Sequence, residues 1–473
     1  MPERNYLKYF FQIFLITFLG FIFVYYSGKS IATGNIRVPL FLFLSFLSAA
    51  IATSIKTGIY YLFIYIVFMA FIKRFLFSFQ GFTFYDPTYL IPDIVIITMF
   101  LVVWNKHREK IIYAIKNSFT FKVLLILQII FFLEIFNPLQ GNLMVGIAGS
   151  KFLLIPSFLF YISFGIDRKT LKNLLKMLTW LGFISSLYAI YQFHKGFFEF
   201  EILWAKNAGM VSLFLGQKLR PFSFFPSPGE LSGFLMTAGL IELAMSNLSL
   251  GIILTLLKLI VYGIASFYTN IRAGPFIFLF LFPLILAFKI TKKTLATLSL
   301  YYFILFGILT FISGISLSEL RLNLKGVNPV YTEHFFQGII DPTQKGSSFV
   351  HRLNLWKNAI IYMFRNPIGH GIGVSTLAAN RFGGPPMHVE STFISMIYSC
   401  GIFGFLSLMF LTIYTIFKGF ITLSHKYDKI ILAVWIGFVS IFMGQWIVTY
   451  FQGAFFWLSM GILLRWIDLK EEL

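Results

Sequence analysis

Charged residues are scarce in this chain. Asp, Glu, Lys and Arg make up only 12% of its 473 residues, whereas 58% are hydrophobic and the mean hydropathy is +0.82. Soluble domains are typically about one quarter charged and about half apolar. The composition therefore excludes an ordinary soluble protein and indicates that lipid, not water, covers most of the surface.

Cysteine is nearly absent too. Cys400 is the one cysteine, and it lies within an apolar run. No disulfide can form within the chain, which excludes a small ectodomain held together by disulfides. A structural zinc site with cysteine ligands is not expected for the same reason.

The few charges that are present are mostly basic. Lys and Arg number 38 against 18 Asp and Glu, which gives a formal net charge of +20. In a soluble protein this excess would suggest nucleic acid, but the cytoplasmic loops of membrane proteins also collect Lys and Arg. We therefore expect membrane lipids and no nucleic acid as partners. Cations outside the membrane can in addition bind anionic phosphates.

Apolar runs long enough to cross a membrane recur along the whole chain. A transmembrane helix needs roughly 20 apolar residues, and hydrocarbon leaves the backbone no alternative to a helix in such runs. The N-terminal run is too long for a signal-peptide core, so we expect it to be retained. The prediction is an all-α integral membrane protein, a single domain over residues 1–473, with about 12–14 transmembrane helices. The candidate spans lie near residues 8–26, 37–54, 57–72, 90–104, 123–136, 143–165, 177–194, 229–245, 250–267, 273–288, 295–313, 392–417, 430–449 and 453–466.

The basic residues predict how these spans are oriented. Four segments between spans are rich in Lys and Arg, namely residues 105–122, 166–176, 289–294 and 418–429. With the N-terminus inside, all four fall on the cytoplasmic side, and so does the C-terminal end. The same count leaves two long segments outside, residues 195–228 and 314–391. We expect these outer segments to cap an extracytoplasmic active site.

The longer outer segment contains one helical pattern and two candidate catalytic residues. Apolar residues recur at intervals of three and four over residues 347–367, which predicts an amphipathic helix with Arg352 on the flank of its apolar face. A loop rich in Gly and Pro follows and ends with His388 and Glu390, just before the span 392–417. A helix N-terminus favours anions, so Glu390 is either a simple cap or part of a site.

Other cations also fall in the outer half on this topology. Arg220 precedes a Pro-rich turn, and Arg272 lies at the outer mouth of a span. Lys151 lies inside an apolar run, where an ionisable residue normally faces a cavity or a partner. Any one of these cations could instead anchor the chain to lipid headgroups. Three further arginines are expected in water: Arg321, Arg365 and Arg381.

The order of these pieces along residues 140–415 resembles the O-antigen polymerase and ligase superfamily. The pieces are Arg220–Pro226, Arg272-Ala273-Gly274, Arg352–Trp356, Asn366-Pro367-Ile368-Gly369 with Gly371 and Gly373, then His388 or Glu390, and finally Gly401–Gly404. The resemblance implies a membrane glycosyltransferase with the C-type (GT-C-like) architecture. Such an enzyme would use glycans on undecaprenyl diphosphate, without a nucleotide sugar, at the outer face of a bacterial inner membrane.

One departure from the family pattern bears on the reaction. Ligases, which move a finished chain to lipid A-core, usually carry His-Asn eleven residues before the first Gly of the Gly-x-x-Gly pair. Eleven residues before Gly401, this chain has Glu390 followed by Ser391. The difference favours a polymerase that extends O-antigen or a similar surface polysaccharide. A lipid-linked oligosaccharide flippase is a further alternative, although its charges should follow a central pathway.

The resemblance and the chemistry together suggest roles for the candidate residues. The cations expected to bind diphosphates are Arg220, Arg272, Arg352 and Lys151. Glu390 is the first candidate for the base that deprotonates the acceptor hydroxyl, and His388 is the second. The outer segments contain no Asp-rich cluster, so we expect neither a metal nor another cofactor. The sequence leaves open whether the protein works alone or with a chain-length-regulating co-polymerase.

Overall fold

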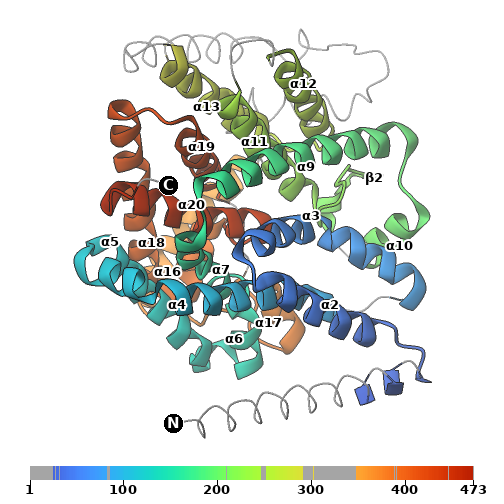
Figure 1. Cartoon of the computed structure of the whole chain (residues 1–473). Helices are drawn as coiled ribbons and strands as arrows, with labels where there is room; N and C mark the ends of the chain where they lie inside the picture. The colour runs from blue at the N-terminus through green and yellow to red at the C-terminus, as the bar shows by residue number, and fades with distance from the viewer. Residues whose placement is uncertain are drawn as a thin grey trace, which may run out of the picture.

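A bundle of helices makes up the structure, a computed structural model shown in Figure 1. The structure describes residues 25–26, 28–30, 32–81, 86–208, 210–246, 252–290, 302, 348–387, 389, 391–445 and 447–471.

The first half of the chain contributes long helices and one broken segment. Its elements are α2 (Arg37–Ala52), α3 (Ile55–Gln80), η1 (Pro87–Leu90), α4 (Ile91–Asn117), α5 (Phe119–Leu133), η2 (Glu134–Phe136), η3 (Pro138–Gln140), α6 (Leu143–Ser150), α7 (Leu154–Ser157), α8 (Leu159–Ile162), η4 (Ser163–Gly165) and α9 (Arg168–Lys195). The predicted span 143–165 is thus a series of short helices, because the chain turns after Ser150. Interrupted helices are tolerated at membrane depth only where protein or a cavity satisfies the backbone.

The second half adds the remaining helices and a small hairpin. Its elements are α10 (Glu199–Ala208), η5 (Val211–Leu213), β1 (Phe214–Leu215), β2 (Lys218–Leu219), α11 (Pro228–Met245), α12 (Ile252–Tyr268), α13 (Ala273–Ile290), α16 (Ser348–Arg365), α17 (Leu377–Phe382), α18 (Thr392–His425), α19 (Lys429–Gly444) and α20 (Tyr450–Asp468). Strands β1 and β2 pair antiparallel, with Phe214 opposite Leu219.

The predicted spans agree with these helices. Every span predicted between residues 37 and 288 and between 392 and 466 corresponds to a helix or to the broken series above. Within the described part of the chain, six segments are long and apolar enough to cross a membrane. The chain is therefore a multi-pass membrane protein. The predicted spans 8–26 and 295–313 lie almost entirely outside the described residues.

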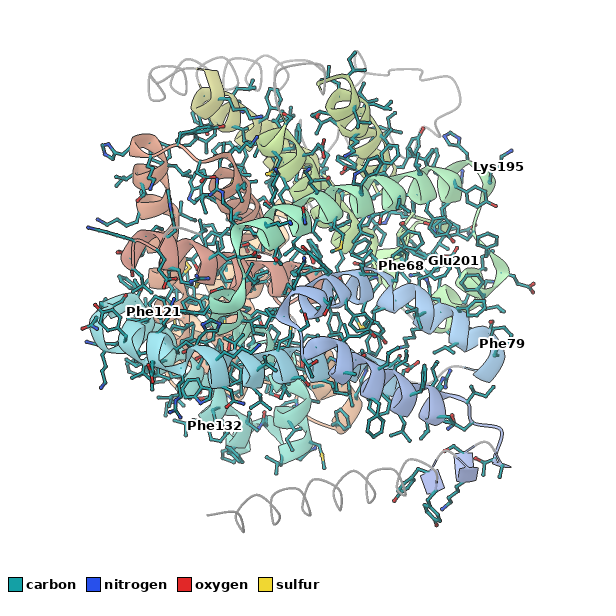
Figure 2. The ribbon with its side chains drawn as sticks, in the orientation of Figure 1. Phe68, Phe79, Phe121, Phe132, Lys195 and Glu201 are labelled. Atoms are coloured by element: carbon teal, nitrogen blue, oxygen red, sulfur yellow. The ribbon has the colours of Figure 1, made fainter. Side chains whose placement is uncertain are left out.

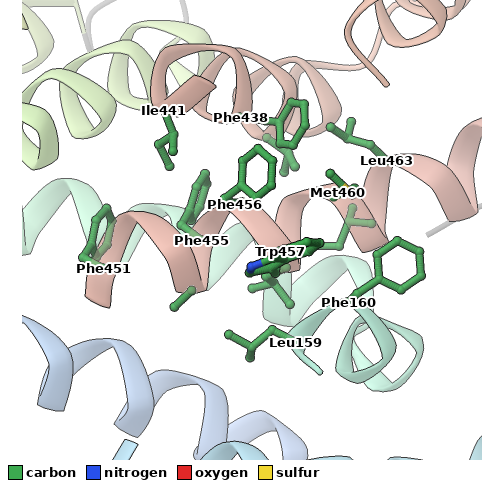
Figure 3. Packing of buried hydrophobic residues seen from close by; sticks show 14 of the residues in the cluster. Leu159, Phe160, Phe438, Ile441, Phe451, Phe455, Phe456, Trp457, Met460 and Leu463 are labelled. Carbon is green, nitrogen blue, oxygen red and sulfur yellow. The ribbon is translucent and has the colours of Figure 1, made fainter. Parts of the chain in front are cut away.

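The C-terminal helix α20 lies at the centre of the bundle. Its residues from Phe451 to Trp466 are all buried, and α8, α18 and α19 pack around it. Phe456 stacks on Phe438 of α19 with ring centroids 4.7 Å apart, as Figure 3 shows. A helix that is mostly apolar around its whole circumference belongs in such an enclosed position.

Three of the four basic segments, residues 105–122, 166–176 and 418–429, share one end of the bundle. Arg168 contacts Asp428 at 2.6 Å, whereas Ser118 and Lys110 contact the C-terminal residues Asp468 at 2.8 Å and Glu471 at 3.8 Å. The guanidinium of Arg465, near the end of α20, also donates to the carbonyl of Ser163 just before α9. The starts of α5 and α9 and the ends of α4, α18 and α20 therefore lie together. In Figure 2, Phe121 marks this end, and Lys195 and Glu201 mark the opposite one.

The predicted amphipathic helix is present as α16. Ala359 and Met363 are buried against Ile394 of α18, whereas Phe364 is 71% exposed. One apolar side of α16 thus packs on the bundle, and another remains available for lipid.

Helix α18 is kinked where the loop after α16 enters the bundle. Gly401 adopts φ 60° and ψ −156°, a conformation outside the helical region that only glycine adopts readily. The kink frees the carbonyl of Tyr398 to accept a hydrogen bond from the His370 amide at 2.8 Å. The Ile402 amide in turn donates to the carbonyl of Pro367 at 2.9 Å. The conformation of Gly401 therefore lets the loop after α16 pair with an opened transmembrane helix.

The same loop passes α6 at a point where only glycines fit. A Cβ added to Gly149 would lie 2.4 Å from the Cα of Gly373. We therefore expect Gly149→Ala to destabilise the fold by about 1–3 kcal/mol, because two backbones would have to separate. Gly263→Ala is the matched control, since its Cβ would meet nothing within 4 Å. Thermal unfolding in detergent checks this prediction, and equal melting temperatures for the two variants would contradict it.

Candidate functional site

A cavity of about 580 Å³ lies at the end of the bundle opposite the basic segments. The ends of α3 and α10 meet the starts of α11 and α20 there, together with α17 and the chain just before α18. The described residues that line it are Lys73, Tyr89, Phe152, Trp204, Ala208, Met210, Pro226, Glu230, Ser375, Thr376, Asn380, Arg381, Pro386, Met387, Val389, Val448, Thr449 and Tyr450. Its size is that of a small-molecule site.

Two tyrosines form a continuous aromatic surface on this cavity. The rings of Tyr89 and Tyr450 stack with centroids 5.8 Å apart and planes within 6° of parallel. The ammonium of Lys73 lies 4.5 Å from the centre of the Tyr89 ring, a cation–π contact. Flat aromatic rings beside polar side chains suit sugars, which have apolar faces and polar edges.

Lys151, one of the predicted diphosphate ligands, lies against the same rings but has a partner of its own. Its ammonium is 5.3 Å from the ring centres of both Tyr89 and Tyr450. It is also 3.5 Å from a carboxylate oxygen of Asp93, and it donates a hydrogen bond to the carbonyl of Tyr89. Asp93 therefore balances the charge of Lys151 within the bundle.

Arg381 lies on the cavity, although the sequence placed it in water. Its helix α17 is held against the bundle, because Ser375 bonds to the hydroxyls of Ser395 and Ser399 of α18 at 2.6 Å each. Thr376 then caps α17 by accepting a hydrogen bond from the Ala378 amide at 3.1 Å. In this position of α17, half-buried Arg381 lines the cavity.

Lys73 and Glu230 are charged lining residues that sequence reasoning missed. Lys73 belongs to the pair Lys73-Arg74 within the apolar run of α3, and ionisable residues in such runs are rare. Glu230 is the acid of a Ser-x-x-Glu sequence at the start of α11, which is typical of a helix cap. Its amide does donate to Ser227 Oγ at 3.2 Å, but its side chain faces the cavity.

Two of the other predicted site residues, Arg220 and Arg272, lie in described parts of the chain. Arg220 follows strand β2, and its guanidinium donates to the carbonyl of Ser212. Arg272 directly precedes α13. Neither is among the described residues that line the cavity. The side chain of Arg352, on α16, lies outside the described residues, as do His388 and Glu390.

A buried ion pair holds the turn between Arg220 and α11. Arg74 is fully buried, 3.7 Å from Glu201 of α10. Its guanidinium donates to the carbonyl of Phe225 at 2.6 Å and also to that of Ser223. Gln192 of α9 accepts a hydrogen bond from the Ser223 amide at 2.7 Å. These contacts fix the turn that leads to Glu230 on the cavity wall.

Burying the ion pair of Arg74 and Glu201 costs desolvation free energy. Burial raises the pKa of the Glu201 carboxyl, and neighbouring Arg74 offsets this only in part. The guanidinium of Arg74 also lies 5.5 Å from the ring centre of Trp204, which lines the cavity. We interpret this pair as a device that positions the cavity wall, since a buried ion pair by itself adds little stability.

Comparison with protein families identifies part of the chain. Residues 257–409 match the family described as O-antigen ligase, so this part carries a domain of that family. Its enzymes are membrane glycosyltransferases that act on lipid-linked glycans. The match confirms the resemblance seen in the motif order. None of the curated proteins compared matches the chain.

Proposed function

Because residues 257–409 carry a domain of the O-antigen ligase family, we propose that the protein joins glycans carried on undecaprenyl diphosphate. The observation that supports this most directly is the polar wall of the cavity from Ser375 to Val389, which lies within the matched residues. An aromatic surface, two cations and a carboxylate on one cavity provide the groups that a charged glycan needs.

The proposed reaction is a direct displacement at the anomeric carbon of the donor. A hydroxyl of the acceptor sugar attacks that carbon, the bond to the diphosphate oxygen breaks, and undecaprenyl diphosphate leaves. The hydroxyl proton passes to the base, Glu390 in first place and His388 in second. One displacement inverts the anomeric centre. Cations stabilise the charge on the leaving group in place of a metal, with candidates Arg220, Arg272, Arg352 and Lys151.

The position of Val389 supports the choice of base. Val389 lines the cavity, and it lies between His388 and Glu390 in the chain. Ser391 then caps α18 by accepting a hydrogen bond from the Ile394 amide at 3.2 Å. Glu390 therefore precedes the capping residue, and capping the helix does not require its carboxylate.

We further propose that the cavity faces the extracytoplasmic side of a bacterial inner membrane. The basic end of the bundle would then be cytoplasmic, together with both termini, as the excess of Lys and Arg predicts. Residues 195–228 and 314–391 would cap the cavity from outside. A single membrane domain of about 12–14 spans with the C-type glycosyltransferase architecture accommodates this arrangement.

Polymerisation is the first candidate for the exact reaction, and ligation to lipid A-core is the second. The sequence Glu390-Ser391 supports a polymerase, since ligases usually have His-Asn at this point. Asparagine caps helices about as well as serine, so the chemically important difference is Glu for His. The description of the matched family, O-antigen ligase, supports ligation as the second candidate.

The test uses purified protein and a lipid-linked repeat unit, with a chelator and without nucleotide. We expect a ladder of products that differ by one repeat unit. A single transfer to added lipid A-core would instead identify a ligase. No product with either acceptor, combined with outward movement of the lipid-linked unit in vesicles, would identify a flippase. Adding a chain-length-regulating co-polymerase would change the ladder's distribution only if the protein works with such a partner.

A further inference from the structure

Lys73 is a buried cation that faces the cavity. It lies near the end of α3, only 7% exposed, and it lines the cavity wall. Its ammonium contacts the Tyr89 ring at 4.5 Å. Among the described residues, no carboxylate lies within ion-pair distance of it. Burying an unpaired charge costs free energy that a cation–π contact offsets only in part.

Two other lysines with little exposed side chain, half-buried Lys151 and buried Lys258, each have an acidic partner. Lys151 has Asp93 at 3.5 Å, and Lys258 has Glu242 at 3.0 Å. Lys258 resembles Lys73 closely in other respects, because it is 3% exposed and lies 4.1 Å from the ring centre of Trp180. Lys73 therefore differs from these two lysines in having no acidic partner among the described residues and in lining the 580 Å³ cavity.

The groups around Lys73 indicate what binds there. Arg381 lines the same cavity, and Thr376 and Asn380 beside it offer a hydroxyl and an amide. The two cations outnumber Glu230, the acidic residue on the described lining, so the set matches a diphosphate, which carries several negative oxygens, better than it matches an uncharged sugar. The Tyr89 ring lies beside Lys73 and stacks on Tyr450, where the first sugar would follow the diphosphate.

We propose that Lys73 and Arg381 form the binding site for the diphosphate of a polyprenyl-diphosphate glycan, with Tyr89 holding the ammonium in place. The proposal rests on the function proposed above, and it adds two residues to the predicted ligands. Lys73 belongs to none of the family motifs, and it lies outside the matched residues 257–409.

The test measures binding of inorganic pyrophosphate to the purified full-length protein by calorimetry. Lys73→Met should weaken binding by roughly 10- to 100-fold, because a charge-assisted hydrogen bond is lost. Lys73→Arg should retain most of the affinity. The melting temperature without ligand should stay equal or rise in Lys73→Met, since an unpaired buried charge is removed.

Lys258→Met is the matched control and should behave in the opposite way. The substitution leaves the Glu242 carboxylate without its cation, so the melting temperature should fall while pyrophosphate affinity stays unchanged. The proposal is wrong if Lys73→Met lowers the melting temperature and leaves the affinity unchanged, because Lys73 would then serve packing alone. A second measurement needs no variant: pyrophosphate should protect Lys73 of the wild-type protein from acetylation, as measured by mass spectrometry. Absence of protection would also overturn the proposal.

Two further ligands test whether the site takes a lipid diphosphate or the free ion. They also distinguish a failure of this site from a failure of the proposed function. Farnesyl diphosphate should bind more tightly than pyrophosphate if the site takes a lipid, and equally if it takes the free ion. Farnesyl monophosphate should bind more weakly than either. A wild-type protein that binds these diphosphates through Lys73 but forms no glycan product would overturn the proposed function and leave the anion site standing.

Discussion

Replacing Glu390 with glutamine is expected to slow glycan transfer by about 100- to 10,000-fold, the usual contribution of a general base. Glutamine keeps the shape of the side chain but cannot accept the proton of the acceptor hydroxyl. Because Ser391 is the residue that caps α18, the variant should remain folded. The rate is measured as product formed from a lipid-linked repeat unit by purified protein.

A histidine at the same position separates catalysis from a structural role. An active base must be deprotonated, so activity falls as the pH drops through its pKa. Histidine ordinarily titrates about two pH units above glutamate, so Glu390→His should move this acidic limit upward by about that amount. Glu199→Gln is the control, because Glu199 is exposed in the first turn of α10. An unchanged pH profile in Glu390→His would argue against Glu390 as the base.

Breaking the buried pair beneath the cavity wall should have the largest effect on stability. Arg74→Met leaves Glu201 buried without its cation, which we expect to cost about 3–5 kcal/mol in free energy of unfolding. Arg168→Met is the matched control, since the side chain of Arg168 in its pair with Asp428 is 47% exposed and exposed pairs contribute less than about 1 kcal/mol. Thermal unfolding in detergent compares the two, and equal losses would contradict the prediction.

A double variant tests whether this pair positions the turn before α11. Arg74→Met combined with Glu201→Leu removes both charges, so most of the lost stability should return. The carbonyls of Ser223 and Phe225 would still lack the donors that Arg74 supplies. We therefore expect transfer activity to remain low in the double variant. Full recovery of activity would show that the pair has no positioning role.

The apolar helices within the described residues could be predicted because a membrane span depends on composition alone. Apolar runs must become helices in lipid, and the Lys-rich segments between them must share a side. The contact between Arg168 and Asp428 is consistent with that grouping. The family could likewise be recognised from the order of its Arg and Gly motifs.

The cavity could not be predicted, because it depends on contacts between segments distant in sequence. Lys73 and Tyr450 are more than 370 residues apart in the chain, yet both line the cavity. Arg381 was expected in water because nothing in its sequence shows that Ser375 anchors the preceding loop to α18. The pair Lys73-Arg74 within an apolar run was the one available signal, since charges in spans usually mark functional sites.

The most direct test is a cryo-electron microscopy structure of the protein with a methylene-bisphosphonate analogue of the lipid-linked repeat unit. The bisphosphonate should lie between Lys73 and Arg381, with the first sugar against Tyr89 and Tyr450. Density for the analogue at Arg272 or elsewhere on the surface, with nothing bound in the cavity, would contradict the assignment of this cavity as the site of glycan transfer.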